Sequence, residues 1–483
     1  MEKTQQVHEL LCRTRDSVRV IRGLSQQENV VFASACFACL FSKCGSKLAI
    51  VDLHGVKVLK TSDFTELMSV RRSNVQLLHF SECAKYLVSW EKPQEETPNL
   101  IIWDTTTGTP IYSLVQKKFM KECWPTIIFN ADSTRFYIKG GSDLCIYRIP
   151  EPQPLLIFNQ IRVTSFFISS KTNMLIIYTG DSKGEGSKIS ICVETATGLE
   201  KTAELGVKYV QEIKVLWNKD AQRAVIWCQT DVDTTGRSYY GEHSLYIYTP
   251  EIKLKQVKTT EGPIHDVQWN PVDNEFIVIS GFMPATTNFF NLNGNKKSEI
   301  AKHHRNTIKW NRFGTLVLIA GFGNLHGEID IYDKETMNMI GHCRAPSTVY
   351  CEWGPCGKVF VAATLCPRMR VDNGYCVYKY TGELLVRVME PTELWEVAWT
   401  PQVFVFEPLT PSHKEQVVVQ KKTYKPPGSS SGFAAHFKAV KESASGKLQV
   451  QHAPPPPPSD FIPGMAPEPA KKKKKKKKPA AGK

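Results

Sequence analysis

The segments VLWNKDAQRAVIW (215–227) and VQWNPVDNEFIVI (267–279) are two copies of one sequence unit. Each opens with a short apolar stretch that ends in a large anchor residue, Trp217 or Trp269. A polar residue and a turn follow, and then a strongly apolar run rich in the β-branched residues that favour strands. A unit that recurs along a chain indicates a repeat architecture, which takes precedence over a domain count based on length.

The unit occurs nine times in the 483 residues, at intervals of 39 to 52 residues. This period matches four-stranded propeller blades whose loops vary in length. The sequence therefore predicts an all-β fold, a single β-propeller of WD40-like blades, with nine blades as the expected number. The anchors are Phe41, Phe80, Phe129, Ile168, Trp217, Trp269, Trp310, Trp353 and Trp399.

The second half of each unit also repeats, as in IIWDTTTGTPIYSL (101–114) and IDIYDKETMNMIGH (329–342). Such strand–turn–strand patterns are typical of hairpins, and no long segment has a helical period. The alternative is a row of stacked β-sandwiches, which the constant period disfavours. The chain after Trp399 has room for two strands, so we expect the N-terminal hairpin at 8–22 to complete the ninth blade and close the ring.

The net charge of +14 is concentrated in the last part of the chain. Residues 421–483 contain 15 lysines and three acidic residues, a charge of +12, which leaves +2 for the rest. We therefore predict a propeller over residues 1–420 and a disordered Pro/Lys-rich tail over residues 421–483. The tail includes five prolines at 454–458 and the run Lys471, Lys472, Lys473, Lys474, Lys475, Lys476, Lys477 and Lys478.

The lysine run predicts salt-dependent attraction to RNA. A nuclear import signal and a solubilising tail are the alternatives for this run. The five prolines favour a polyproline helix, which suits an aromatic-lined groove on a partner.

Long insertions fall repeatedly between the second and third strands of the expected blades, at 91–99, 180–187, 230–243, 281–287, 321–328 and 365–374. Because blade strands alternate in direction, these loops must share one face of the propeller. Loops on a rigid scaffold commonly carry function. Arginine with tyrosine suits RNA phosphates and bases or a protein hot spot, whereas solvated loop residues are the plainer interpretation. The candidate contact residues are Arg237, Tyr239, Tyr240, His326, Arg368 and Arg370.

No motif for catalysis or for a cofactor occurs in the sequence: it lacks a P-loop and a nucleophile elbow. Cys36 and Cys39 form a C-x-x-C without a second ligand pair at zinc-like spacing, so we expect no metal site and largely buried free thiols. The charged N-terminal segment lacks a signal peptide's apolar run, and no segment has the length of a membrane span. The sequence predicts a cytoplasmic protein that is not an enzyme and has no membrane partner.

Several segments resemble the eukaryotic translation initiation factor 2A family. They are VLWNKDAQRAVIWCQTDVDTTGRSYYGEHSLYIY (215–248), GPIHDVQWNPVDNEFIVISGFMPA (262–285), TLVLIAGFGNLHGEIDIYD (315–333), ATLCPRMRVDNGYCVYKYTGELL (363–385), ELWEVAW (393–399) and KTYKPPG (422–428). The resemblance covers residues 30–427 and implies a nine-bladed propeller.

The same resemblance implies a factor that brings initiator methionyl-tRNA to the small (40S) ribosomal subunit without GTP, on selected mRNAs. It implies the small subunit and the initiator tRNA as partners, with mRNA and other initiation factors as further ones. Longer members of the family carry an extended charged C-terminal region, where this chain has its polyproline–polylysine segment. The competing hypotheses are a non-catalytic scaffold for protein partners with an RNA-attracting tail, and an enzyme that uses the central channel.

Overall fold

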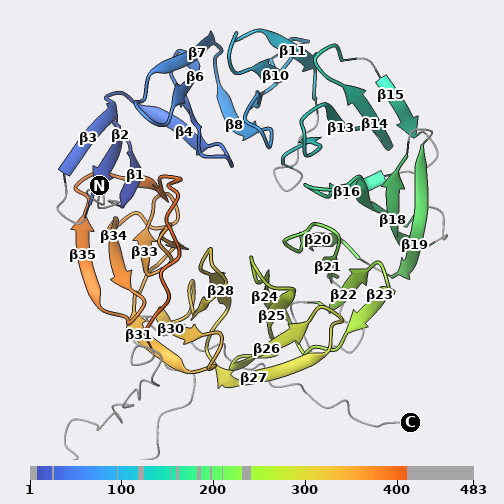
Figure 1. The fold of residues 1–483 in the computed structure, drawn as a ribbon. Coiled ribbons are helices and arrows are strands. Elements are labelled where there is room, and N and C mark those ends of the chain that lie inside the picture. Colours follow the sequence, from blue (N-terminus) through green and yellow to red (C-terminus); the bar gives the residue numbers. More distant parts are fainter. Residues whose placement is uncertain are drawn as a thin grey trace, which may run out of the picture. The chain divides into compact units, whose positions relative to one another are not determined.

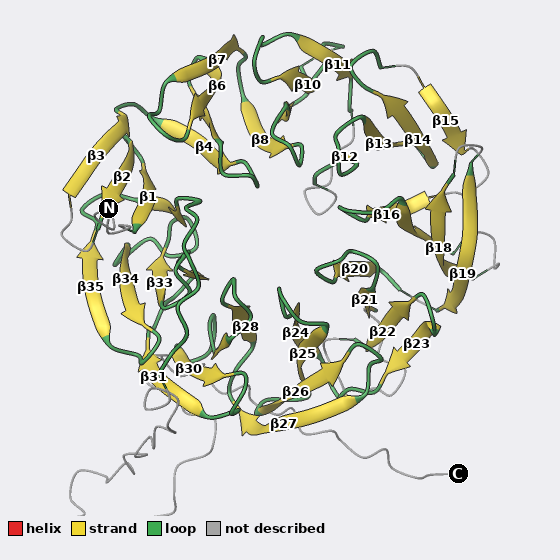
Figure 2. Cartoon of the chain, viewed as in Figure 1, coloured by secondary structure: helices red, strands yellow, loops and turns green. Residues whose placement is uncertain are grey.

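The computed structural model describes residues 8–23, 27–94, 96–117, 124–152, 154–158, 163–181, 186–195, 198–208, 210–230 and 241–410. In these residues, 36 strands form nine antiparallel four-stranded sheets, and Figure 1 shows them arranged as blades in a closed ring. Figure 2 shows strands and loops in this part of the chain. The predicted nine-bladed β-propeller is confirmed. No described helix has the length and hydropathy needed to cross a membrane.

Each of the first four blades runs in sequence from its innermost to its outermost strand. Blade 1 contains β4 (Cys36–Phe41), β5 (Lys47–Asp52), β6 (Gly55–Lys60) and β7 (Glu66–Arg71), and blade 2 contains β8 (Val75–Phe80), β9 (Tyr86–Glu91), β10 (Leu100–Asp104) and β11 (Pro110–Leu114). Blade 3 contains β12 (Ile127–Phe129), β13 (Arg135–Gly140), β14 (Asp143–Arg148) and β15 (Pro154–Phe158), and blade 4 contains β16 (Val163–Ile168), β17 (Met174–Thr179), β18 (Ser187–Glu194) and β19 (Leu199–Val207).

Blades 5 to 8 follow the same order. Blade 5 contains β20 (Glu212–Trp217), β21 (Ala224–Gln229), β22 (His243–Thr249) and β23 (Lys253–Val257), and blade 6 contains β24 (Ile264–Trp269), β25 (Glu275–Ser280), β26 (Ala285–Asn291) and β27 (Lys296–His303). Blade 7 contains β28 (Thr307–Trp310), β29 (Leu316–Ala320), β30 (Glu328–Asp333) and β31 (Met339–Arg344), and blade 8 contains β32 (Tyr350–Trp353), β33 (Val359–Thr364), β34 (Gly374–Lys379) and β35 (Leu384–Met389).

Blade 9 joins the two ends of the propeller. Its innermost strand is β36 (Leu394–Trp399), and its outer strands are the N-terminal β1 (Glu9–Thr14), β2 (Val18–Arg22) and β3 (Gln27–Phe32). Leu10 pairs with Trp399 and Cys12 with Val397 across the closure. The expected closing hairpin at 8–22 is therefore confirmed as β1–β2.

The composition of blade 9 corrects the expectation of two strands after the last anchor. The N-terminal segment supplies three strands rather than two, and residues 401–410 contain none. Pro401 and Pro408 lack the N–H groups that a ladder needs. We call residues 401–410 the strap, because they run from blade 9 over the turns of blades 8 and 7. Arg312 in blade 7 donates to the Gln402 carbonyl at 3.1 Å, and Lys358 in blade 8 pairs with Glu407 at 2.8 Å.

All nine predicted anchors end the innermost strand of their blade. Trp269, Trp353 and Trp399 each donate the indole N–H to a backbone carbonyl of the preceding blade, at 2.8 to 3.2 Å. The described residues also form nine buried apolar clusters, one between each pair of neighbouring blades. The core is thus a ring of similar interfaces, and burial of their apolar area stabilises the closed propeller.

The two faces of the propeller differ in how its strands are connected. We call turn face the one that carries the turns from first to second strand and from third to fourth strand, together with the strap. The loop face carries the connections from second to third strand and from one blade to the next. Each of the six stretches predicted as insertions begins where a second strand ends, which is on the loop face. In the stretch 281–287 the connection is only 281–284, because Ala285 begins β26. Residues 95, 182–185 and 231–240 of these stretches lie outside the described residues.

Candidate functional site

The loops of blades 7 and 8 bring together part of the predicted contact surface. They span residues 321–327, between β29 and β30, and residues 365–373, between β33 and β34. A Cβ on Gly323 would lie 3.2 Å from Nη2 of Arg368, so the two loops touch. His326 is exposed on the blade 7 loop, and its carbonyl accepts a hydrogen bond from Nε of Arg344 at 3.0 Å. Arg368 and the loop of His326 are therefore neighbours on the loop face.

The blade 8 loop is held rigidly at its base. Buried Asn373 accepts a hydrogen bond from the backbone N–H of Leu394 at 3.1 Å and donates to the Met369 carbonyl at 2.9 Å. The Cys366 N–H donates to the Leu394 carbonyl at 2.8 Å. These bonds tie the loop to the first residue of β36. A loop fixed in this way presents its exposed side chains in one geometry, which lowers the entropy lost on binding.

Arg370 lies on the other side of the same loop, toward blades 9 and 1. It lines a pocket of about 460 Å³ with Arg13 of β1, Trp395 of β36 and Phe37 of β4. Phe37 is 49% exposed, and Arg370 is exposed with no ion pair to another described residue. The pocket therefore offers aromatic surface beside an uncommitted guanidinium. The remaining lining residues are Cys366, Pro367 and Glu393.

Arg13 has a structural role inside this pocket. Its guanidinium lies 5.2 Å from the centroid of the Trp395 ring, a cation–π contact. Its Nε pairs with Glu396 at 3.0 Å, and its Nη1 donates to the Cys36 carbonyl at 3.1 Å. Arg13 thus joins β1, β36 and β4 and orients the tryptophan. The cation left for a ligand in the pocket is Arg370.

The two thiols behind the pocket are unreactive in this setting. Burial raises the pKa of Cys36 to about 11, and burial together with nearby Glu396 raises the pKa of Cys39 well above its ordinary value. Neutral thiols are poor nucleophiles and poor metal ligands. The described cysteines are free thiols and mostly buried, as expected, but Cys44 and Cys83 are exposed in turns. The part of the chain that the structure describes contains no cluster of three or more metal-ligating side chains.

Some predicted residues fall outside the described part of the chain. These are Arg237, Tyr239 and Tyr240 of the blade 5 loop and the lysines 471–478 of the tail. Of the described candidates, Arg368 faces blade 7, whereas Arg370 faces blades 9 and 1. Sequence reasoning missed Arg13, Phe37 and Trp395, because ring closure brings residues more than 380 positions apart into one pocket. The available sequence signal was an aromatic residue at the second position of an innermost strand, as at Phe37 and Trp395.

The sequence of this chain is similar to a known protein family and to several of its members. The family model described as eukaryotic translation initiation factor 2A matches residues 207–397. The chain is 39% identical over 439 residues to eukaryotic translation initiation factor 2A of Caenorhabditis elegans, covering 83% of this chain and 75% of that protein. It is 29% identical to the Drosophila melanogaster protein of that name, covering 92% of this chain and 72% of that one.

The fold itself is also found in a solved structure. A crystal structure described as that of a eukaryotic initiation factor superposes with a TM-score of 0.73 at 24% identity, covering 82% of this chain and 99% of that one. The propeller and its relatives together define a translation initiation factor built as a β-propeller. The chain belongs to the eukaryotic translation initiation factor 2A family. This membership and the scaffold fold agree with a role in binding.

Proposed function

We propose that this initiation factor binds the small (40S) ribosomal subunit and directs initiator methionyl-tRNA to it without GTP, on selected mRNAs in the cytoplasm. The observation that carries the proposal is the pocket in which Arg370 stands beside Phe37 and Trp395 on a rigid loop face. A guanidinium beside aromatic rings suits a phosphate and a stacked base. The absence of a P-loop from the sequence is compatible with a role that needs no GTP.

The C-terminal tail supports the proposal independently of the pocket. Lysine runs attract RNA through counterion release, and their contribution falls steeply with salt. We therefore assign residues 421–483 a long-range electrostatic role and the propeller over residues 1–420 the specific contacts. Arg368, His326 and the blade 5 residues Arg237, Tyr239 and Tyr240 are further candidate contacts on the loop face. mRNA and other initiation factors are further candidate partners.

Cosedimentation with purified small subunits, with and without initiator methionyl-tRNA and across a salt series, tests this function. We expect the intact chain to bind, a chain ending at residue 420 to lose the salt-sensitive part, and Arg370→Ala to weaken what remains. Arg148→Ala, which removes an exposed arginine from the turn face, is the matched control. If the intact chain binds neither small subunits nor initiator tRNA, the proposal is overturned in favour of a scaffold for protein partners.

A further inference from the structure

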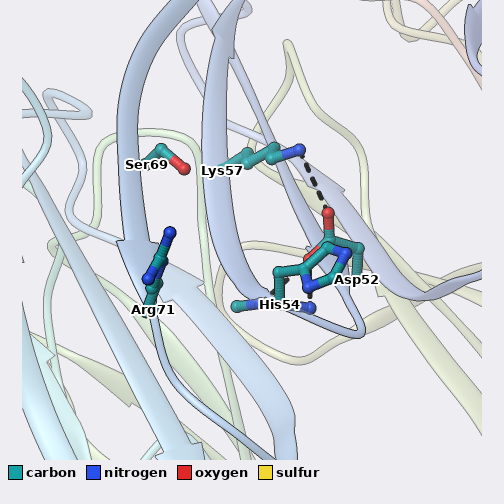
Figure 3. A pocket seen from close by; sticks show the side chains of 6 residues that line it. Asp52, His54, Lys57, Ser69 and Arg71 are labelled. Atoms are coloured by element: carbon teal, nitrogen blue, oxygen red, sulfur yellow. Dashed lines mark hydrogen bonds and ion pairs between the residues drawn. The ribbon is translucent and has the colours of Figure 1, made fainter.

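A hollow of about 610 Å³ lies at the loop-face end of blade 1, apart from the Arg370 pocket. Figure 3 shows its lining residues, which come from β5, β6, β7 and the short connection between β5 and β6. In the sheet, Gly55 of β6 pairs with Arg71 of β7, and Lys57 pairs with Ser69. Because these four residues lie at alternate positions, the side chains of Lys57, Ser69 and Arg71 share one face of the blade.

The backbone at Gly55 and the turn beside it shape this hollow. Gly55 has φ of +151°, and a Cβ there would lie 2.0 Å from the Val70 carbonyl oxygen. Asp52 closes the preceding turn: its Oδ1 accepts hydrogen bonds from the N–H groups of His54 at 2.7 Å and Gly55 at 2.9 Å. No long insertion covers this blade, because β5 and β6 are only two residues apart. The hollow is therefore a fixed and open feature of the fold.

The hollow has more positive than negative groups. Lys57 forms an ion pair with Oδ2 of Asp52 at 3.1 Å, and its ammonium lies 4.9 Å from the centroid of the Phe32 ring. Burial of Asp52 favours its neutral form, but hydrogen bonds from His54, Lys57 and Gly55 outweigh this effect and hold the pKa of Asp52 below its usual value, so Asp52 is ionised. Arg71 is exposed and has no ion pair with another described residue. The guanidinium of Arg71, the Ser69 hydroxyl and the His54 ring thus remain free to contact an anion.

We propose that this hollow, which we call the phosphate cradle (Asp52, His54, Gly55, Lys57, Ser69 and Arg71), binds a backbone phosphodiester of single-stranded RNA. Arg71 and Lys57 supply the positive charge, and the Ser69 hydroxyl donates a hydrogen bond. Guanidinium groups match the geometry of phosphate oxygens, and hydroxyls are common donors to them. The proposal rests on the proposed function insofar as it makes RNA the partner, but it concerns a second position on the molecule.

The position of the cradle favours RNA over an acidic peptide. Cys36 of β4 pairs with Asp52 of β5 in the same sheet, so the loop-face edge of blade 1 runs from Phe37 in the Arg370 pocket to Arg71 in the cradle. Four neighbouring strands span three inter-strand spacings, about 14 Å. A stacked strand covers that length with about four nucleotides at ~3.4 Å each. A base against Phe37 or Trp395 and a phosphate in the cradle then belong to one short segment.

Fluorescence anisotropy with a labelled single-stranded RNA of on the order of ten nucleotides tests the cradle. The full-length chain with lysines 471–478 replaced by Gln is the background, so that the tail does not mask the propeller. We expect Arg71→Gln to lower the affinity about five- to tenfold and to reduce the slope of log affinity against log salt by about one. Arg148→Gln, the same loss of charge on the turn face, is the control and leaves both unchanged.

A second variant acts in the opposite direction. Asp52→Asn retains the Oδ1 acceptor for the turn but removes the carboxylate that pairs with Lys57. We expect it to raise RNA affinity about three- to tenfold, because Lys57 is released for the phosphate and a repulsive charge is lost. A role of this ion pair in folding alone predicts no gain in RNA affinity. Thermal unfolding of both variants shows whether each retains the parent's fold.

The possible outcomes separate the cradle from the proposed function. Equal losses with Arg71→Gln and Arg148→Gln, or no gain with Asp52→Asn, would overturn the cradle even if small subunits still bind. A matching loss for a labelled polyglutamate peptide would make the cradle a general anion site and would also overturn the RNA proposal. If Arg71→Gln alone loses RNA binding while the intact chain binds neither small subunits nor initiator tRNA, the cradle is supported and the proposed function is refuted.

Discussion

The turn face and the loop face of the propeller use polar side chains for different purposes. On the turn face, the polar residue after four of the anchors is buried and bonded both to its own turn and to the next blade; these residues are Ser169, Asn218, Asn270 and Asn311. Oδ1 of Asn270 accepts hydrogen bonds from the N–H groups of Val272 at 2.8 Å and Asp273 at 2.9 Å. Its Nδ2 donates to the Gly314 carbonyl of blade 7 at 2.9 Å. On the loop face, Arg71, Arg368 and Arg370 are exposed and form no ion pair with a described residue.

The strap strengthens this contrast between the faces. Phe404 stacks on His8 with ring centroids 4.9 Å apart, and Phe406 packs on Phe313 at 5.1 Å. The strap thereby covers turns of blades 7 and 8 and contacts the start of the N-terminal hairpin. One face is thus occupied by contacts that hold the ring together, and the other leaves cations available to a ligand. The difference separates stability from binding, so the two properties can be changed independently.

Removal of the N-terminal strands has the largest expected effect on the turn face and the ring. Without residues 1–32, β36 loses its partner strands. The cluster between blades 9 and 1 loses its whole blade 9 side, and the cluster between blades 8 and 9 keeps only the β36 residues of that side. We expect no cooperative thermal unfolding, because the loss exceeds the about 5–15 kcal/mol by which domains are stable. Circular dichroism during heating measures this. Restoration of cooperative unfolding by an added peptide of residues 8–32 is the control, and a transition close to that of the intact chain would refute closure by blade 9.

Blade 9 shows which parts of the fold the sequence predicts and which parts it does not. Self-similarity located every anchor at the end of an innermost strand, because each blade buries the same kind of residue against its neighbour. It did not predict β3, whose QENVVF has no clear alternation of polar and apolar residues. It also missed the Arg370 pocket and the cradle. These depend on ring closure and on strand register, which bring together residues without a common sequence motif.

Low pH is expected to destabilise the turn face at His79, which lies in β8 one residue before the anchor Phe80. Burial, with a smaller contribution from Lys43, lowers the pKa of His79 from 6.5 to about 4. The folded state therefore favours the neutral imidazole of His79. The contribution of this residue to stability is present in full above pH 6.5 and is lost as the pH falls toward 4. We expect a loss of about 2–3 kcal/mol across this window, measured by urea unfolding at several pH values. His79→Gln should flatten that part of the profile, and an unchanged slope would contradict the assignment.

A matched pair of asparagines compares the faces directly. Asn270→Ala removes three hydrogen bonds made by a fully buried side chain and should lower the free energy of unfolding by about 2 kcal/mol. Asn324→Ala makes the same chemical change on the exposed blade 7 loop and should change it by less than about 0.5 kcal/mol. Urea unfolding measures both variants. Equal effects would show that the turn face does not hold the blades together as its hydrogen bonds indicate.

The narrowest comparison lies within the loop-face pocket, where the two arginines are expected to differ in their effect on stability. Arg13→Ala removes the ion pair with Glu396, the bond to the Cys36 carbonyl and the contact with Trp395, and should destabilise the fold by about 1–3 kcal/mol. Arg370→Ala should leave unfolding within about 0.5 kcal/mol of the parent while weakening small-subunit binding. Because both arginines line one pocket, a stability loss with Arg370→Ala would show that binding and ring closure are not separable there, even on the face that carries no strap.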